Sequence, residues 1–201
     1  MTVFFHYSIH GFANVYLVGN DETNDALIVD PASITLPLLE FIETRKFNIS
    51  AVLLTHNHAH HLDGLRTLRR IYDVEVYSSN STILGEPCRM IADGELFTVC
   101  GLEAQALSVP GHAPDSLVYR FGKILFTGDT LHAGTIGKTM SQYGNRLLRE
   151  QLERKVLSQS DDCIVLPGHG PPSSIGAEKQ FNVGLRDQNA ERKKSHPYLY
   201  T

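Results

Sequence analysis

Four histidines lie within six residues of the sequence, at positions 56, 58, 60 and 61. They directly follow residues 51–55, whose apolar run is typical of a buried strand, and leucines at helical spacing come after them. Because His56 and His58 are two residues apart, their side chains lean to the same side of an extended backbone and can hold one metal ion. The histidine cluster therefore predicts a metal site where a strand ends and a helix begins.

Three other strand-like segments also end in a residue that can bind a metal. His112, Asp129 and His169 each follow such a segment and come directly after a glycine. Glycine permits a sharp backbone turn, which lets bulky side chains from separate strand ends converge. An adventitious histidine-rich loop would not explain these equivalent positions. Since Zn²⁺, Fe and Mn accept imidazole and carboxylate ligands, we expect one or two divalent ions as cofactors.

The composition is that of an ordinary globular protein. The 201 residues are 42% hydrophobic and 20% charged, with a formal net charge of -4. Dispersed Lys and Arg residues predict no nucleic-acid partner, and the absence of any apolar run near 18 residues predicts no membrane span. The first residues do not resemble an export signal, and the three cysteines form no CxxC pair, so we expect a cytoplasmic protein with reduced thiols. The oligomeric state is left open.

Apolar runs and turn residues predict strands and helices along the whole chain. The predicted strands cover residues 15–18, 26–29, 51–55, 74–77, 95–99, 102–109, 117–121, 123–127 and 163–166. Helical spacing covers residues 33–42, 62–71 and 145–157. No linker or shift in composition divides the sequence, so we expect a single domain of mixed α/β structure over residues 1–201.

In their order along nearly the whole chain, seven segments resemble those of the metallo-β-lactamase superfamily, and within it the glyoxalase II-like (hydroxyacylglutathione hydrolase-like) thioesterases. The segments are 14–18 (NVYLV), 28–31 (IVDP), 55–61 (THNHAHH), 109–116 (VPGHAPDS), 125–131 (LFTGDTL), 133–137 (AGTIG) and 166–172 (LPGHGPP). The resemblance implies an αββα sandwich with its metal site at one edge of the two sheets. Two-domain glyoxalase II enzymes add a C-terminal helical domain that binds glutathione, and the residues after His169 are too few for one.

The resemblance also implies a set of metal ligands. The residues at the family's ligand positions are His56, His58 and His112 for the first ion, His61 and His169 for the second, and Asp129 as the bridge between them.

One position departs from the family motif. The motif reads His-x-His-x-Asp-His, and His60 stands here in place of the aspartate. Four outcomes are open: His60 binds the second ion, Asp63 supplies the missing carboxylate, the second site is weak or empty, or the site selects a metal that prefers nitrogen. We favour a binuclear site with His60 as a ligand over a mononuclear site, and both over a His60 that faces away from the metal.

The resemblance implies a metal-dependent hydrolase whose nucleophile is a metal-bound hydroxide. Thioester hydrolysis suits such a site because a thiolate leaves without a proton, and we expect Asp129 to orient the nucleophile as the catalytic residue. Only Asp129 and one hydroxide would offset the charge of two divalent ions, so the expected substrate is a small anionic thioester. Lys138, His132 and Tyr143 are predicted to contact this substrate.

Two other functions compete with thioester hydrolysis. A persulfide dioxygenase would hold one Fe(II) with two histidines and an aspartate, and a weak second site would favour it. A non-catalytic metal-binding sensor or effector on the same fold is the other alternative, because His60 breaks the motif.

Overall fold

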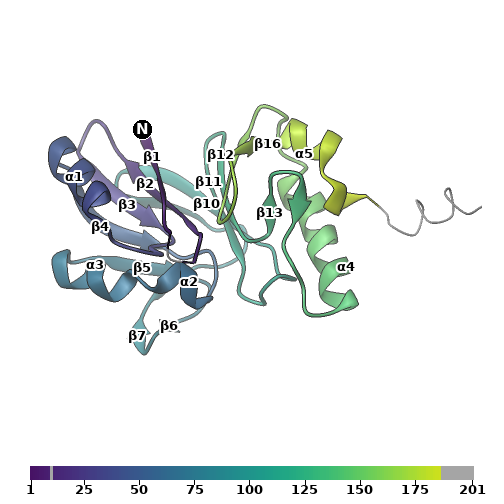
Figure 1. Cartoon of the computed structure of the whole chain (residues 1–201), viewed down its shortest axis with the longest axis horizontal. Coiled ribbons are helices and arrows are strands. Elements are labelled where there is room, and N and C mark those ends of the chain that lie inside the picture. Colours follow the sequence, from purple (N-terminus) through teal and green to yellow (C-terminus); the bar gives the residue numbers. More distant parts are fainter. Residues whose placement is uncertain (10, 187–201) are drawn as a thin grey trace, which may run out of the picture.

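Two six-stranded mixed sheets face each other, and helices cover the outer face of each sheet (Figure 1). The computed structural model describes residues 1–9 and 11–186 of the chain. The succession of helix, sheet, sheet and helix layers confirms the predicted αββα sandwich.

The first sheet has the strand order β1-β2-β3-β4-β5-β8, in which β3, β4, β5 and β8 run parallel and β1 and β2 form an antiparallel margin. Its strands are β1 (Thr2–Tyr7), β2 (Asn14–Gly19), β3 (Asp25–Val29), β4 (Asn48–Leu53), β5 (Glu75–Ser78) and β8 (Arg89–Met90).

The second sheet has the order β16-β15-β12-β11-β10-β9, and only β12 and β15 pair in parallel. Its strands are β9 (Leu96–Val99), β10 (Leu102–Ser108), β11 (Leu117–Phe121), β12 (Ile124–Gly128), β15 (Ile164–Pro167) and β16 (Ser173–Ser174). Two short hairpins lie outside the sheets, formed by β6 (Thr82–Ile83) with β7 (Glu86–Pro87) and by β13 (Leu131–His132) with β14 (Thr135–Ile136).

Helices α1 (Leu36–Arg45), α2 (Ala59–Leu62) and α3 (Leu65–Ile71) lie beside the first sheet, whereas α4 (Gln142–Gln151) and α5 (Ile175–Phe181) lie beside the second (Figure 1). The α4 helix continues into a π-helical turn, Leu152–Val156, and a 3-10 turn, Val183–Leu185, follows α5. Ser141 and Ser174 cap α4 and α5 by accepting a backbone N–H with their hydroxyls.

Alternating side chains of the central strands divide the core into three layers. In β2, Val15 and Leu17 pack towards α1 and α3, whereas Tyr16 and Val18 pack between the two sheets. A third layer fills the space between the second sheet and α4 and α5, and it includes Leu148 and Ile175. Burial of both faces explains why β2 is apolar from Val15 to Val18 rather than alternating.

The helical spacing over residues 62–71 corresponds to two helices rather than one. A turn at Asp63 and Gly64 separates α2 from α3, and Ile71 at the end of the pattern is 49% exposed. The N–H of Gly64 donates to the carbonyl of Pro31 at 2.7 Å, and a Cβ on Gly64 would lie only 2.5 Å from that oxygen. This close approach ties the histidine-bearing helix α2 to the end of β3.

No helix in the described part of the chain is long and apolar enough to cross a membrane. The cytoplasmic location and the single domain over 1–201 stay predictions, and residues 187–201 of that range lie outside the described residues.

Candidate metal centre

Part of the predicted site lies where the parallel strands β3 and β4 end. Asp30 follows β3 and accepts hydrogen bonds from the backbone N–H and the hydroxyl of Thr55, at 2.8 and 2.6 Å. Because the Thr55 hydroxyl donates to Asp30, it accepts from Nδ1 of His56, 3.0 Å away. This chain of hydrogen bonds leaves Nε2 of His56 without a proton and directs it into the site.

Asp129 and His169 follow the other parallel pair, β12 and β15, which brings them side by side. Between them, the N–H of Gly168 donates to the carbonyl of Gly128 at 2.8 Å. A Cβ on Gly168 would lie 2.5 Å from Oδ1 of Asp129 and 2.7 Å from Cε1 of His61. The glycine before His169 is therefore required by close packing inside the site.

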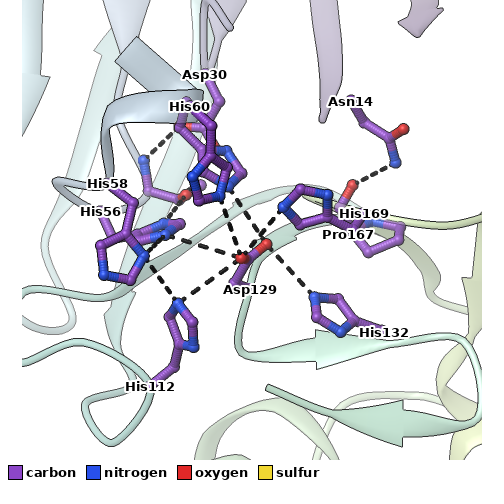
Figure 2. A network of polar contacts seen from close by, with 12 residues as sticks. Asn14, Asp30, His56, His58, His60, His112, Asp129, His132, Pro167 and His169 are labelled. Carbon is purple, nitrogen blue, oxygen red and sulfur yellow. Dashed lines mark hydrogen bonds and ion pairs between the residues drawn. The ribbon is translucent and has the colours of Figure 1, made fainter. Parts of the chain in front are cut away.

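One group of converging side chains, the first cluster, consists of His56, His58, His112 and Asp129 (Figure 2). One ligand atom of each residue lies within 4.8 Å of every other. Nδ1 of His58 is 2.9 Å from Nε2 of His56 and 3.1 Å from Nε2 of His112. Nε2 of His112 is in turn 3.7 Å from Oδ2 of Asp129.

A second cluster consists of His60, His61, Asp129 and His169, with ligand atoms within the same 4.8 Å. Nε2 of His60 and Nε2 of His169 lie 3.9 and 3.4 Å from Oδ2 of Asp129. Nε2 of His61 lies 3.4 Å from Oδ1 of the same carboxylate. Asp129 thus belongs to both clusters, and His60 faces the second one (Figure 2).

Backbone carbonyls orient the two outer histidines. Nδ1 of His112 donates to the carbonyl of Lys138 at 2.7 Å, and Nδ1 of His169 donates to the carbonyl of Phe12 at 2.8 Å. With its Nδ1 proton held in this way, each ring presents the lone pair of Nε2 to the site once it is neutral.

Burial and neighbouring charges set the protonation of the site. Burial, followed by the charge of His61, lowers the pKa of His56 to about 3, so its ring is neutral at pH 7. Burial would also lower the pKa of His61, but the carboxylates of Asp30 and Asp129 raise it to about 10. Burial of Asp129 acts to raise its pKa, yet contacts with the surrounding histidines hold that pKa far below its usual range.

The donor set of both clusters fits divalent ions of the zinc, iron and manganese class. In the first cluster, Nε2 of His56 and of His112 both face Nδ1 of His58, which can donate to only one of them. In the second cluster, both ring nitrogens of His61 are buried without a hydrogen bond of normal geometry, although Asp30 and Asp129 lie 3.2 and 3.4 Å away. A cation in the first cluster would satisfy the ring nitrogen that His58 leaves without a donor. A cation in the second cluster would satisfy Nε2 of His61, whose Nδ1 faces Asp30.

The structure brings together all the predicted ligands, namely His56, His58, His60, His61, His112, Asp129 and His169. Of the predicted substrate contacts, His132 lies 3.4 Å from Asp129, whereas the side chains of Lys138 and Tyr143 are exposed at the surface. Asp63 is exposed and belongs to neither cluster. The roles of these residues in binding metal or substrate stay predictions.

Two residues that orient the site were not assigned a role from the sequence. Asp30 forms a third buried group with His56 and His61. Asn14 donates from Nδ2 to the carbonyls of Pro167 and Gly170, both at 2.8 Å, and so clamps the loop that carries His169 (Figure 2). Both lie in segments that carry the family resemblance, which was the available signal, but only their contacts reveal what they do.

We predict that Gly168→Ala lowers the metal content of the purified protein at least about tenfold, because the added Cβ displaces Asp129 or His61. Gly170→Ala is the matched control on the same loop: a Cβ there meets nothing within 4 Å, and its cost is backbone strain of about 1 kcal/mol at φ +79°. Mass spectrometric metal analysis after gel filtration measures both variants. Equal metal content in Gly168→Ala and wild type would contradict the packing argument.

We also predict that metal binding releases protons. His61, with its pKa raised to about 10, is protonated at pH 7 to 8, so an ion at Nε2 must displace a proton and binds more weakly as the pH falls. The pKa of His169 is raised as well, chiefly by Asp129. Calorimetric titrations at one pH in buffers of different ionisation enthalpy should give about one to two protons released. Binding heats that do not depend on the buffer would refute this expectation.

Comparison with known proteins points to one family. The family model of the metallo-beta-lactamase superfamily matches residues 9–84 and 80–169. The hydroxyacylglutathione hydrolase GloC of Haemophilus influenzae is 30% identical over 200 residues, covering 88% of this chain and 94% of the relative.

Two solved structures share the fold. ETHE1 from Myxococcus xanthus superposes with a TM-score of 0.83 at 26% identity, covering 99% of this chain and 92% of that one. TTHA1623, solved in a di-iron-bound form, gives a TM-score of 0.76 at 26% identity, covering 90% of this chain and 99% of that one. The chain therefore belongs to the metallo-β-lactamase superfamily.

Proposed function

We propose that the protein is a binuclear metallohydrolase that cleaves thioesters in the manner of glyoxalase II. The observation that carries the proposal is the pair of four-residue clusters that share Asp129. Each cluster offers enough nitrogen and oxygen donors for one divalent ion, which is the arrangement of two-metal hydrolases.

His60 is proposed as a ligand of the second ion. Its Nε2 lies 3.9 Å from Asp129 Oδ2, and its ring is 5.2 Å from that of His169, centroid to centroid. Asp63, the alternative carboxylate, is exposed and follows α2 on the way to the turn at Gly64. The position of His60 in the second cluster therefore favours the binuclear reading over a His60 that faces away.

When bound, a divalent ion lowers the pKa of a coordinated water to about 7 and polarises the carbonyl under attack. The protein's own task is to hold the donors in place and to orient the nucleophile through Asp129. No separate general acid is required for a thioester, because a thiolate leaves without a proton. We propose that the buried Asp129, which contacts His61 and His169, accepts a hydrogen bond from the attacking water.

A small anionic thioester is the proposed substrate. The two clusters contain six histidines and the single carboxylate of Asp129, so two divalent ions would leave the site positively charged. The similarity to a hydroxyacylglutathione hydrolase supports the same substrate class. Lys138 and Tyr143 are the proposed surface contacts for the anionic end of the substrate, with His132 deeper in the site.

We predict that the purified, metal-loaded protein hydrolyses S-lactoylglutathione or a related acyl thioester at least about 100-fold faster than the same metal free in solution, a modest enhancement for an enzyme. Release of the free thiol, followed with a chromogenic thiol reagent, measures the rate. Activity no greater than that of free metal would overturn the thioesterase proposal.

The same preparation distinguishes the alternatives. Oxygen consumption with a glutathione persulfide, together with a single bound iron, would establish the dioxygenase instead. A fully metallated chain that is inert towards thioesters, lactones and β-lactams would support a sensor or effector.

We further predict that His60→Asp strengthens binding of the second ion, because a carboxylate restores the missing negative charge. His60→Asn is the matched control, since asparagine has nearly the same shape as aspartate without its charge. This variant should bind the second ion more weakly than the wild type. Isothermal titration with Zn²⁺ measures both affinities. An unchanged stoichiometry and affinity in His60→Asp would show that charge does not limit the second site.

A further inference from the structure

A buried polar anchor lies at the end of α5, against the β13–β14 hairpin. The anchor consists of Glu178 and Asn182, each 3% exposed. The Glu178 carboxylate accepts the N–H of Gly134 at 3.0 Å and the side-chain amide of Asn182 at 2.6 Å, and it also contacts the hydroxyl of Ser173. A buried carboxylate is costly unless several donors satisfy it, so this network is built closely around Glu178.

Asn182 extends the anchor to the other backbone groups of the hairpin. Its Nδ2 donates to the carbonyl of Thr135 at 2.9 Å and to that of His132 at 3.4 Å. Next to it, the N–H of Val183 donates to the carbonyl of Gly134 at 3.0 Å. The turn of the hairpin is therefore fixed from one side by residues 178–183.

The hairpin also carries His132, which belongs to neither cluster but whose side chain contacts Asp129. Nε2 of His132 lies 3.4 Å from Oδ1, and the His132 side chain is 19% exposed (Figure 2). The other oxygen, Oδ2, faces ring nitrogens of both clusters at 3.4 to 4.0 Å, namely those of His56, His60, His112 and His169. Nε2 of His61 also lies 3.4 Å from Oδ1, so His132 and His61 together hold this oxygen and leave Oδ2 to be shared between the clusters.

Apolar packing alone would hold α5 against this part of the fold. Ile175 of α5, Leu131 and Ile136 already lie in one buried cluster. Non-directional packing of this kind fixes the separation of two elements, whereas the hydrogen bonds of Glu178 and Asn182 also fix the orientation of the hairpin backbone. These hydrogen bonds therefore fix the backbone at His132 and Gly134, which lie beside the metal centre.

We propose that Glu178 and Asn182 are positioning residues that aim His132 at Oδ1 of Asp129 and so orient the shared carboxylate towards both clusters. The proposal rests on the proposed function in one respect, that Asp129 bridges two ions. It assigns a role in the metal centre to two residues of α5 and its C-terminal end that are far from the histidine motif in the sequence.

A double-mutant cycle on metal affinity tests the proposal. Glu178→Ala and His132→Ala should each lower the affinity for the more loosely held Co²⁺ ion by about 10- to 100-fold. Losses of this size are typical when a residue that orients a metal ligand is replaced. The double variant should bind Co²⁺ no more weakly than His132→Ala does, because Glu178 acts through His132. Competition with a chelator gives the affinities, and the visible absorption of Co²⁺ reports the geometry of the ligands.

Two further variants separate positioning from a general loss of stability. Ser174→Ala removes the N-cap of the same helix, which accepts the N–H of Ala177 at 3.2 Å, but leaves the anchor intact. It should lower the melting temperature and keep the wild-type Co²⁺ affinity. Glu178→Gln retains an oxygen for Gly134 and Asn182 and should recover most of the affinity lost in Glu178→Ala. If Glu178→Ala does not fold, Asn182→Ala takes its place in the cycle.

Equal Co²⁺ affinities in Glu178→Ala and Ser174→Ala would overturn the proposal, and so would losses that simply add in the double variant. The first result would mean that Glu178 only stabilises α5, and the second that Glu178 affects the metal centre independently of His132. A wild-type protein that binds two Co²⁺ ions and responds as expected to these variants, but hydrolyses no thioester, would contradict the proposed function and leave the positioning role in place.

Discussion

The buried carboxylate of Asp129 is the group on which the geometry of the site depends. Ring nitrogens of His56, His60, His61, His112, His132 and His169 all lie within 4.0 Å of its two oxygens. A carboxylate that is 6% exposed needs positive or hydrogen-bonding partners to remain ionised, and the histidines need a negative group to offset their charge or that of a metal. The carboxylate and the histidines therefore each offset the free-energy cost of burying the other.

The two-sheet fold brings these residues together through its parallel strand pairs. Thr55 and His56 follow the end of β4, and Asp129 and His169 follow the adjacent ends of β12 and β15. Hydrogen bonds join the two sheets next to the site. The N–H of Leu117 donates to the carbonyl of Thr55, and the hydroxyl of Tyr16 donates to the carbonyl of Pro167. The candidate metal centre is thus held by both sheets, and motion of one sheet against the other would pull the two halves of the donor set apart.

Much of this arrangement follows from local sequence features, and the rest depends on contacts between distant segments. Apolar runs that end near a glycine predict the strand ends at Asp129 and His169, and the resemblance of the motifs to those of the superfamily implies the αββα sandwich. The break between α2 and α3 does not follow, because it depends on the approach of Gly64 to Pro31 across the fold. The roles of Asp30 and Glu178 are equally hidden: a single acidic residue has no periodicity, and only its buried partners distinguish it from a surface carboxylate. The side to which His60 turns is likewise a property of the packed site.

We propose that Asp129 is shared by two metal ions, with His60 bound to the second. A crystal structure of the metal-loaded protein, with anomalous difference maps recorded on both sides of the metal absorption edge, would locate these ions. We expect two anomalous peaks about 3.5 to 4 Å apart, with Asp129 between them and Nε2 of His60 within bonding distance of the second. A single peak among His56, His58 and His112, with His60 turned to solvent, would contradict it.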